Sequence, residues 1–285
     1  MPRAVVAAYL ACALIWGTTW YAIRVCIAGY PTFVAVALRF AIAAAILLPI
    51  AARARPWPRG RAWAWLMLAG VIDAAVYLLV YVAEERVPGA VAAVLYGTQP
   101  LILAAMLTAV RIEPLTRRHV IGAVIALAGV VVLFLDRLGV ATRQAAGIGL
   151  MLGSVVLATV YSMIMKQKVA AVNSLVATTL FLAVTAVVLA GVAIGAGEPI
   201  PWPPPRAPTL ALLYLAIVGS VIAFGLYFWL LRRTSLLVTS TLVFVYPLIA
   251  IATDAMFERE LTLSARAYLG AAITLGGLAT SLRRR

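Results

Sequence analysis

The sequence predicts an all-α integral membrane protein whose ten transmembrane helices form two inverted repeats of five helices each. Three observations predict this fold class: the composition, the number of apolar segments and an internal repeat. Of the 285 residues, 65% are hydrophobic and only 11% are charged, whereas soluble chains contain about 45–50% apolar and roughly 25% charged residues. Ten membrane helices of about 20 residues each would take up most of the chain and leave no room for a soluble domain.

Ten apolar segments follow one another along the chain, and each is a candidate for one membrane crossing. The first segment is too long for a cleaved signal peptide, and it carries Trp16, Trp20 and Tyr21 where small residues would mark a cleavage site. The ten segments lie at residues 4–23, 32–52, 62–83, 88–110, 119–136, 145–165, 174–196, 208–231, 235–256 and 266–282.

The Lys and Arg residues lie mainly between the apolar segments, and they favour one side of the membrane. If the N-terminus is cytoplasmic, the cytoplasmic segments hold 15 of the 23 basic residues and the outer segments hold seven. An excess of positive charge is typical of cytoplasmic loops. We therefore expect both termini in the cytoplasm, and we attribute the net charge of +14 to membrane orientation and not to a nucleic-acid partner.

The sequence aligns with itself after a shift of 147 residues, which brings Pro100-Leu101 onto Pro247-Leu248. Because five helices are an odd number, the second repeat must insert upside down relative to the first. Inverted repeats are typical of transporters, which bind the substrate near the membrane midplane between the halves. We expect residues 1–136 and 145–285 to be these two repeats within one membrane domain.

Several side chains on shared helical faces could line a substrate path. In the third segment, Asp73, Tyr77 and Tyr81 are spaced by four residues and therefore share one face. Phe224 takes the place of Tyr77 in the second repeat. Such aromatic stripes suit a cavity for a flat apolar ligand, although they are also common in helix packing. The predicted substrate-binding residues are Trp16, Tyr77, Tyr81, Tyr96, Gln99, Tyr161, Phe224, Phe244 and Tyr246.

Two prolines lie midway along the fourth and ninth segments, next to some of these residues. Tyr96 and Gln99 precede Pro100 in one segment. Tyr246 precedes Pro247 in the other. A proline inside a helix removes a backbone donor and frees a carbonyl about one turn earlier. We expect both prolines to kink their helices and to act as hinges, with the alternative that they only bend the helices around their neighbours.

Arg39 and Asp73 are ionisable residues inside apolar segments. Such residues are rare in membrane helices and usually face the protein interior, where they pair. Arg39 could therefore anchor a substrate carboxylate or form a structural pair with Asp73.

Three short motifs carry a resemblance to a known group of proteins. The first segment contains Leu14-Ile15-Trp16-Gly17-Thr18-Thr19, the second contains Leu38-Arg39-Phe40, and Glu113-Pro114-Leu115-Thr116 follows the fourth. With these motifs the chain resembles the drug/metabolite transporter superfamily, in its ten-helix EamA-type branch, and its aromatic content is most similar to that of bacterial aromatic amino acid exporters. The resemblance implies a ten-helix basket with a central cavity, the export of small metabolites and a multi-pass location in the bacterial inner membrane. Because the Leu-Arg-Phe motif occurs in members with many substrates, it favours the structural pair of Arg39 with Asp73.

The leading hypothesis is an inner-membrane transporter that exports small amphipathic metabolites, above all aromatic or other neutral amino acids, by alternating access through a central cavity. The alternatives are an exporter of drugs, purines or other metabolites, and a membrane assembly protein that transports nothing. An enzyme is not expected, because the sequence has a single histidine, His119, and neither Gly-x-Ser-x-Gly nor His-Glu-x-x-His. We expect no metal and no cofactor, and a monomer whose partners are the lipid bilayer and a small-molecule substrate.

Overall fold

The computed structural model describes residues 2–87, 92, 95–110, 116–133, 145–257 and 265–282, and within these ranges every regular element is a helix. The predicted all-α class is confirmed. In the first half of the chain the helices are α1 (Arg3–Ile27), α2 (Thr32–Ala51), α3 (Arg61–Glu84), α5 (Gln99–Val110) and α6 (Arg117–Leu133). In the second half they are α7 (Ala145–Lys168), α8 (Ser174–Ala196), α9 (Arg206–Ala216), α10 (Ala223–Arg233), α11 (Leu236–Ser240), α12 (Tyr246–Phe257) and α13 (Ala265–Leu282).

Six helical stretches within the described residues are long and apolar enough to cross a membrane. They are α1, α2, α3, α7, α8 and the stretch Arg206–Arg233, which joins α9 to α10. Three shorter apolar stretches accompany them, at Gln99–Val110, Leu236–Ala250 and Leu269–Thr280. The membrane class follows from these lengths, whereas the number of ten spans stays a prediction.

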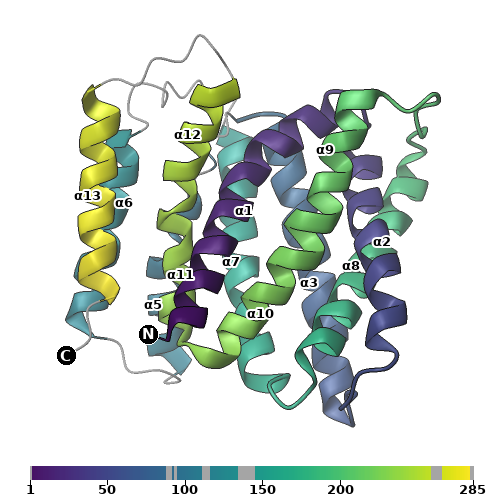
Figure 1. Ribbon diagram of the computed structural model, residues 1–285, viewed down its shortest axis with the longest axis horizontal. Helices are drawn as coiled ribbons and strands as arrows, with labels where there is room; N and C mark the ends of the chain where they lie inside the picture. The colour runs from purple at the N-terminus through teal and green to yellow at the C-terminus, as the bar shows by residue number, and fades with distance from the viewer. Residues whose placement is uncertain are drawn as a thin grey trace.

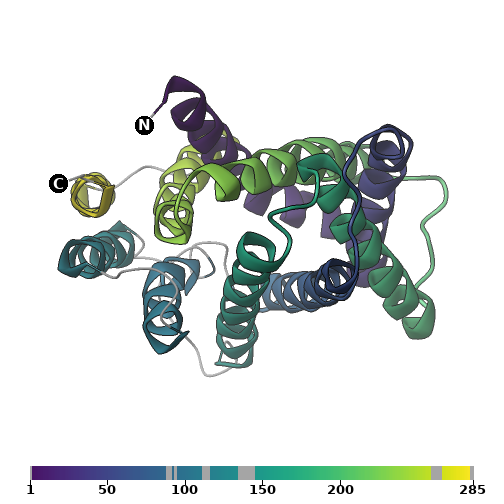
Figure 2. The same ribbon diagram turned by 90° about the horizontal axis from the view of Figure 1, so that it is seen from below.

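The helices stand side by side, with their axes roughly along one direction (Figure 1). Seen along that direction, α6 and α13 form a pair at one edge of the bundle, and α2 packs against α8 at the opposite edge (Figure 2). Between these edges, α1 packs against α9, α10 and α12, while α3 packs against α7 and α8. The start of α1 and the end of α13 lie at the same end of the bundle (Figure 1).

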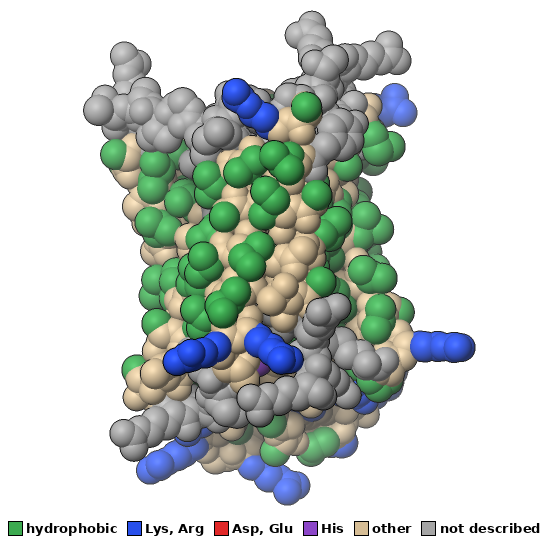
Figure 3. Space-filling view, turned by 90° about the vertical axis from the view of Figure 1, so that its left-hand side faces the viewer, with side chains coloured by type: hydrophobic (Ala, Val, Ile, Leu, Met, Phe, Trp, Pro, Cys, Tyr) green, Lys and Arg blue, Asp and Glu red, His purple; other side chains and the backbone are tan. Residues whose placement is uncertain are grey.

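The face that carries α6 and α13 has the surface expected of a membrane protein. Apolar side chains cover its middle band, and most of the visible Lys and Arg side chains gather at the end where α1 starts and α13 ends (Figure 3). The exposed apolar side chains of these two helices include Ile121, Val124, Leu269 and Leu275. Because charged groups are costly in hydrocarbon, this band marks the surface that lipid covers.

Small residues allow α6 and α13 to approach closely. A Cβ atom on Gly129 would lie 2.4 Å from the backbone nitrogen of Thr274, and one on Gly277 would lie 2.3 Å from that of Ala126. Both distances are far below van der Waals contact, so only glycine fits at these two positions. Close backbone packing through small residues is the usual way in which membrane helices associate.

Two irregular segments lie between helices of the second half. A π-helical segment, Ile217–Ile222, joins α9 to α10, and a tight 3-10 turn, Thr241–Phe244, separates α11 from α12. Pro100 and Pro247 are each the second residue of a helix, in α5 and α12. Each proline therefore stands where a helix begins, and not at a kink within a continuous helix as the sequence suggested. The first turn of a helix suits proline because its backbone nitrogens have no partner within the helix.

Candidate functional site

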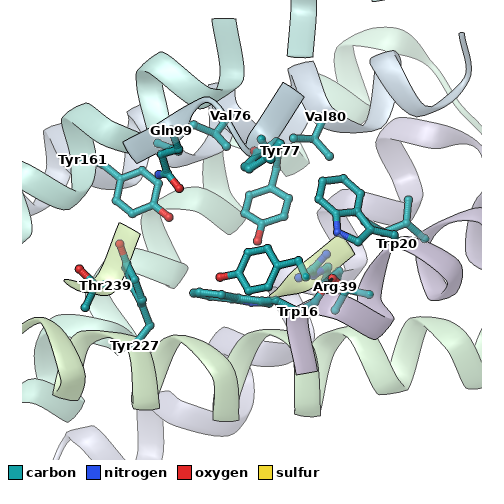
Figure 4. A pocket seen from close by; sticks show the side chains of 15 residues that line it. Trp16, Trp20, Arg39, Val76, Tyr77, Val80, Gln99, Tyr161, Tyr227 and Thr239 are labelled. Atoms are coloured by element: carbon teal, nitrogen blue, oxygen red, sulfur yellow. Dashed lines mark hydrogen bonds between the residues drawn. The ribbon is translucent and has the colours of Figure 1, made fainter. Parts of the chain in front are cut away.

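A cavity of about 90 Å³ lies in the middle of the bundle, and 15 residues line it (Figure 4). A water molecule occupies about 30 Å³ of liquid, so the cavity has room for a few waters or for part of a small ligand. Six of the residues predicted to bind substrate line it: Trp16, Tyr77, Tyr96, Gln99, Tyr161 and Tyr246.

Trp16 on α1 lies at the centre of a group of aromatic rings on one side of the cavity and contacts three of them. Its ring centroid lies 5.1 Å from that of Tyr227, 5.5 Å from that of Phe224 and 6.0 Å from that of Tyr246. The contacts to Phe224 and Tyr246 are edge-to-face. Aromatic pairs prefer this geometry, and each adds roughly 0.5–1.5 kcal/mol beyond the burial of its area. The wall is therefore rigid and apolar, with phenol groups at its edges.

Three of the predicted residues lie behind the cavity wall. Tyr81, Phe224 and Phe244 are almost fully buried and are not among the lining residues. Phe224 packs between the rings of Trp16 and Tyr77, at centroid distances of 5.5 and 6.2 Å. A shared helical face points to the interior of a bundle, but part of that interior is filled by packing and only part of it is open.

Several polar groups of the wall are available to a ligand. The hydroxyl of Tyr227 lies 2.9 Å from that of Ser162, so it is already bonded. In the part of the chain that the structure describes, the hydroxyls of Tyr77, Tyr161 and Tyr246 have no hydrogen-bond partner. The side-chain amide of Gln99 also has none there, and it can both donate and accept. The cavity thus offers phenol and amide groups between aromatic faces.

Arg39 also lines the cavity, and its guanidinium is held by neutral groups. Its Nε donates to the hydroxyl of Ser220 at 2.9 Å, and its Nη2 donates to the carbonyl of Gly219 at 3.3 Å. A longer contact of 3.5 Å runs from Nη1 to the hydroxyl of Tyr81. The guanidinium carbon lies 4.8 Å from the ring centroid of Tyr77, a cation–π distance.

Asp73 is fully buried, but it does not pair with Arg39. Its Oδ2 lies 3.0 Å from the hydroxyl of Thr185, whereas its Oδ1 has no hydrogen-bond partner. Among the described residues, no ion pair joins the two side chains. The structural pair favoured by the sequence is therefore wrong for this conformation, because Arg39 turns instead to the π-helical segment at Gly219 and Ser220.

The π-helical segment is a feature that the sequence did not reveal. The carbonyl of Gly219 within it accepts hydrogen bonds from Trp16 Nε1 and from Arg39 Nη2, each at 3.3 Å. Single π-helical turns leave carbonyls out of the regular ladder and are frequent at functional sites. Here the segment lies between α9 and α10 and is hydrogen-bonded to Trp16 of α1 and Arg39 of α2, two residues that line the cavity.

Sequence reasoning also missed residues of the wall, including Trp20, Tyr227 and Thr239. The ring centroid of Trp20 lies 5.3 Å from that of Tyr96. Tyr227 could have been found from the sequence, because it lies three residues after the predicted Phe224 and so shares its helical face. Thr239 lies in the short helix α11 and has no comparable signal.

Among the described residues, no group of three His, Cys, Asp or Glu side chains could hold a metal ion. The two cysteines, Cys12 and Cys26, are both buried and free. Aromatic, aliphatic, hydroxyl, amide and guanidinium groups line the cavity.

Comparisons with known proteins agree with this architecture. The model of the EamA-like transporter family matches residues 3–135 and again residues 145–283. The chain is 28% identical to YedA of Escherichia coli, which is described as an uncharacterized inner membrane transporter. The match extends over 242 residues, which are 84% of this chain and 78% of YedA. The same values hold for YedA of the strains K12, O6:H1 and O157:H7. A solved crystal structure with 24% identity shares the fold, with a TM-score of 0.80 over 99% of this chain and 98% of that chain. The chain belongs to the EamA-like transporter family.

Proposed function

We propose that this protein is a multi-pass transporter of the bacterial inner membrane that exports small amphipathic metabolites, above all aromatic or other neutral amino acids. The observation that carries the proposal is the central cavity, whose aromatic wall contains unbonded tyrosine hydroxyls and the amide of Gln99. The similarity to YedA of E. coli, described as an inner membrane transporter, supports the inner-membrane location and the transport role.

An aromatic amino acid suits this wall on chemical grounds. Its ring can stack against Trp16, Tyr77 and Tyr246, which line the cavity. Its polar end can bond to Gln99 and to the phenol groups without burying a further charged side chain. The resemblance in aromatic content to the bacterial aromatic amino acid exporter YddG favours the same substrate class. Purines and flat drugs share the ring but lack the zwitterion, so they form the second candidate class.

We further propose that residues 1–136 and 145–285 are inverted repeats of five spans each. The double match of the family model supports this division. The helix boundaries support it as well. Aligning Thr32 with Ser174 brings α2 (Thr32–Ala51) onto the start of α8 (Ser174–Ala196), and aligning Gln99 with Tyr246 brings α5 (Gln99–Val110) onto α12 (Tyr246–Phe257).

The wall of the cavity follows the same correspondence. In the register that aligns α2 with α8, Trp16 corresponds to Ala158 and Thr19 corresponds to Tyr161, and all four line the cavity. In the register that aligns α5 with α12, Gln99 corresponds to Tyr246, which lines the cavity as well. A cavity built from equivalent positions of both halves is what alternating access requires, because each half then forms one side of a shared site.

The proposed orientation has both termini in the cytoplasm. The start of α1 and the end of α13 lie at one end of the bundle, where Lys and Arg side chains gather (Figure 3). Positive charge at the cytoplasmic side is the general rule for membrane proteins.

The test is transport by the purified protein in liposomes. Vesicles are loaded with a panel of radiolabelled amino acids, purines and cationic drugs, and efflux is compared with that of protein-free vesicles. We expect efflux of phenylalanine and tryptophan, and its loss in the Tyr246→Ala variant, which removes one ring of the wall. Efflux of purines or drugs alone would favour the second class. The absence of any efflux across the panel would favour a membrane assembly role.

A further inference from the structure

Among the residues that the structure describes, the wall of the cavity carries one positively charged side chain and no acidic one. Among the 15 described residues that line it, Arg39 is the one basic residue and none is acidic. An arginine side chain stays protonated in proteins. Arg39 is only 1% exposed, so its charge lies deep within the bundle and reaches open space only in the cavity.

The hydrogen-bond partners of Arg39 accept from its N–H groups, but none of these partners carries a negative charge. The guanidinium has five N–H donors, and three neutral oxygens accept from it: the Ser220 hydroxyl, the Gly219 carbonyl and, at 3.5 Å, the Tyr81 hydroxyl. Within the part of the chain that the structure describes, two of its N–H groups have no acceptor. A buried charge is costly unless it is both paired and hydrogen-bonded, and charged side chains inside membranes usually mark a substrate or ion pathway.

Trp20 provides a second and independent observation. Its indole Nε1 is buried and has no hydrogen-bond partner, and the residue lines the same cavity. The nitrogen edge of its ring is turned toward Arg39 (Figure 4). Buried donors are bonded in the great majority of cases. An indole N–H that has no partner among the described residues, turned toward the one guanidinium of the wall, therefore points to a ligand that accepts hydrogen bonds and carries negative charge.

We propose that Arg39 and Trp20 form the binding site for a carboxylate group of the substrate. The inference rests on the proposed function and adds the charge that the substrate must carry. A carboxylate matches the fork of a guanidinium with two parallel hydrogen bonds, and its single charge equals the one positive charge of the wall. A phosphate dianion would leave one negative charge unbalanced in a low-dielectric site.

The site accepts a carboxylate with or without a neighbouring ammonium. In an amino acid, the ammonium can donate to the Gln99 amide oxygen or to the hydroxyls of Tyr161 and Tyr246. In an aromatic acid without nitrogen, those groups bind water instead. An aromatic amine lacks the group that Arg39 recognises and brings a second positive charge to the wall. The site therefore discriminates against amines.

The first test uses the unaltered protein and four matched ligands: L-phenylalanine, 3-phenylpropionate, methyl 3-phenylpropionate and 2-phenylethylamine. Binding to the purified protein in detergent is measured by titration calorimetry. We expect the two carboxylates to bind at least about 10-fold more tightly than the ester and the amine, because hydrogen bonds between charged groups are stronger than those to a neutral ester. Equal affinity for 3-phenylpropionate and its methyl ester would overturn the proposal without any mutation.

The second test uses Arg39→Gln and Trp20→Phe, with Arg24→Gln as the matched removal of a positive charge elsewhere. Arg24 lies on α1 and is not among the lining residues. We expect Arg39→Gln to weaken both carboxylates about 10-fold or more, Trp20→Phe to weaken them a few-fold, and Arg24→Gln to change neither. Arg39→Lys is the second variant, to be used if Arg39→Gln fails to fold. It keeps the positive charge but lacks the two parallel N–H donors of the guanidinium, so we expect an intermediate affinity for the carboxylates. Unchanged affinity in Arg39→Gln or Arg39→Lys would contradict the proposal.

Transport of the same ligands in liposomes separates this inference from the proposed function. Transport of phenylalanine by Arg39→Gln at the parent rate and affinity would overturn the carboxylate site and leave the transporter role intact. If carboxylate binding depends on Arg39 but the protein transports none of the ligands, the carboxylate site would stand and the transporter role would be overturned.

Discussion

The indole Nε1 of Trp16 donates a hydrogen bond of 3.3 Å to the carbonyl oxygen of Gly219. Trp16 lines the central cavity, and Gly219 lies in the π-helical segment between α9 and α10. The same oxygen accepts from Arg39 Nη2. Hydrogen bonds therefore link the π-helical segment directly to the wall of the cavity. We expect a change in the conformation of one to alter the conformation of the other.

Replacing Trp16 separates the hydrogen bond from the ring. Trp16→Phe keeps an aromatic ring and loses the bond to Gly219, so we expect a loss of roughly 0.6–1.7 kcal/mol in stability and a small change in transport. Trp16→Ala also loses the contacts to Tyr227 and Tyr246, and we expect it to abolish transport of aromatic amino acids. Thermal unfolding in detergent and liposome efflux measure the two effects. Equal transport by both variants would show that the ring does not contact the substrate.

Replacing Thr185 by valine should destabilise the protein through Asp73. The substitution removes the hydroxyl next to Asp73 Oδ2 and leaves both carboxyl oxygens without a partner. We expect a cost of about 1–3 kcal/mol, the penalty of an unsatisfied buried polar group. Thr178→Val is the matched control on the same helix, because the Thr178 hydroxyl bonds only to the Ser174 carbonyl of its own helix. Equal melting temperatures for the two variants would contradict this role of Thr185.

A methyl group at Gly277 should push α6 and α13 apart. Its Cβ would lie 2.3 Å from the backbone nitrogen of Ala126, which cannot move without the whole of α6. We expect Gly277→Ala to cost about 1–3 kcal/mol, the usual range for overpacking. The neighbouring Gly276→Ala is the control, because no atom lies within 4 Å of its added Cβ. Thermal unfolding of the two variants should therefore differ clearly, and similar curves would argue against close packing at this pair.

Gln99→Ala tests the polar side of the cavity. The amide of Gln99 lines the cavity and has no partner among the described residues, so a bound amino acid should bond to it. Loss of one neutral hydrogen bond of about 0.5–1.5 kcal/mol predicts a KM for phenylalanine that rises roughly 2- to 13-fold. Gln167→Ala, at the exposed end of α7, should leave KM unchanged. A parent-like KM in Gln99→Ala would place the polar end of the substrate elsewhere.

Cysteine labelling tests the orientation. With Cys12 and Cys26 replaced by alanine, single cysteines are introduced as Trp57→Cys, Thr116→Cys and Trp202→Cys. The proposed topology places positions 57 and 116 in the cytoplasm and position 202 outside. An impermeant thiol reagent applied to intact cells should react at position 202, which is 89% exposed, and at neither of the others. Reaction at position 57 or 116 would reverse the orientation.

The helices were predictable from the sequence, because an apolar segment of membrane length can satisfy its backbone hydrogen bonds within itself only as a helix. α2 and α8 begin at the first residue of an expected segment, and α8 also ends where that segment ends. The correspondence of Pro100 with Pro247 was predictable too, and both residues take the same place in their helices. Their exact local structure was not, because a proline is compatible with a kink or with a helix start.

The details of the interior were harder to predict. Residues 217–222 are mostly apolar, and such residues fit a π-helical turn and an α-helical turn alike. The positions of Tyr81 and Phe244 show a second limit. Helical spacing identifies the face that points inward, but the open volume depends on which neighbouring helices meet there. That information lies in the packing of the two halves and not in the period of one helix.

The small size of the cavity has a consequence for inhibitors. With a volume of about 90 Å³, it encloses only part of an aromatic amino acid, so carriage of the whole molecule requires the walls to separate and then close around it. A bulkier analogue with the same polar end would enter the separated form and block its closure. Such molecules would arrest the transport cycle with the ligand still bound. Enlarged substrate analogues are therefore the natural starting point for inhibitors of this transporter.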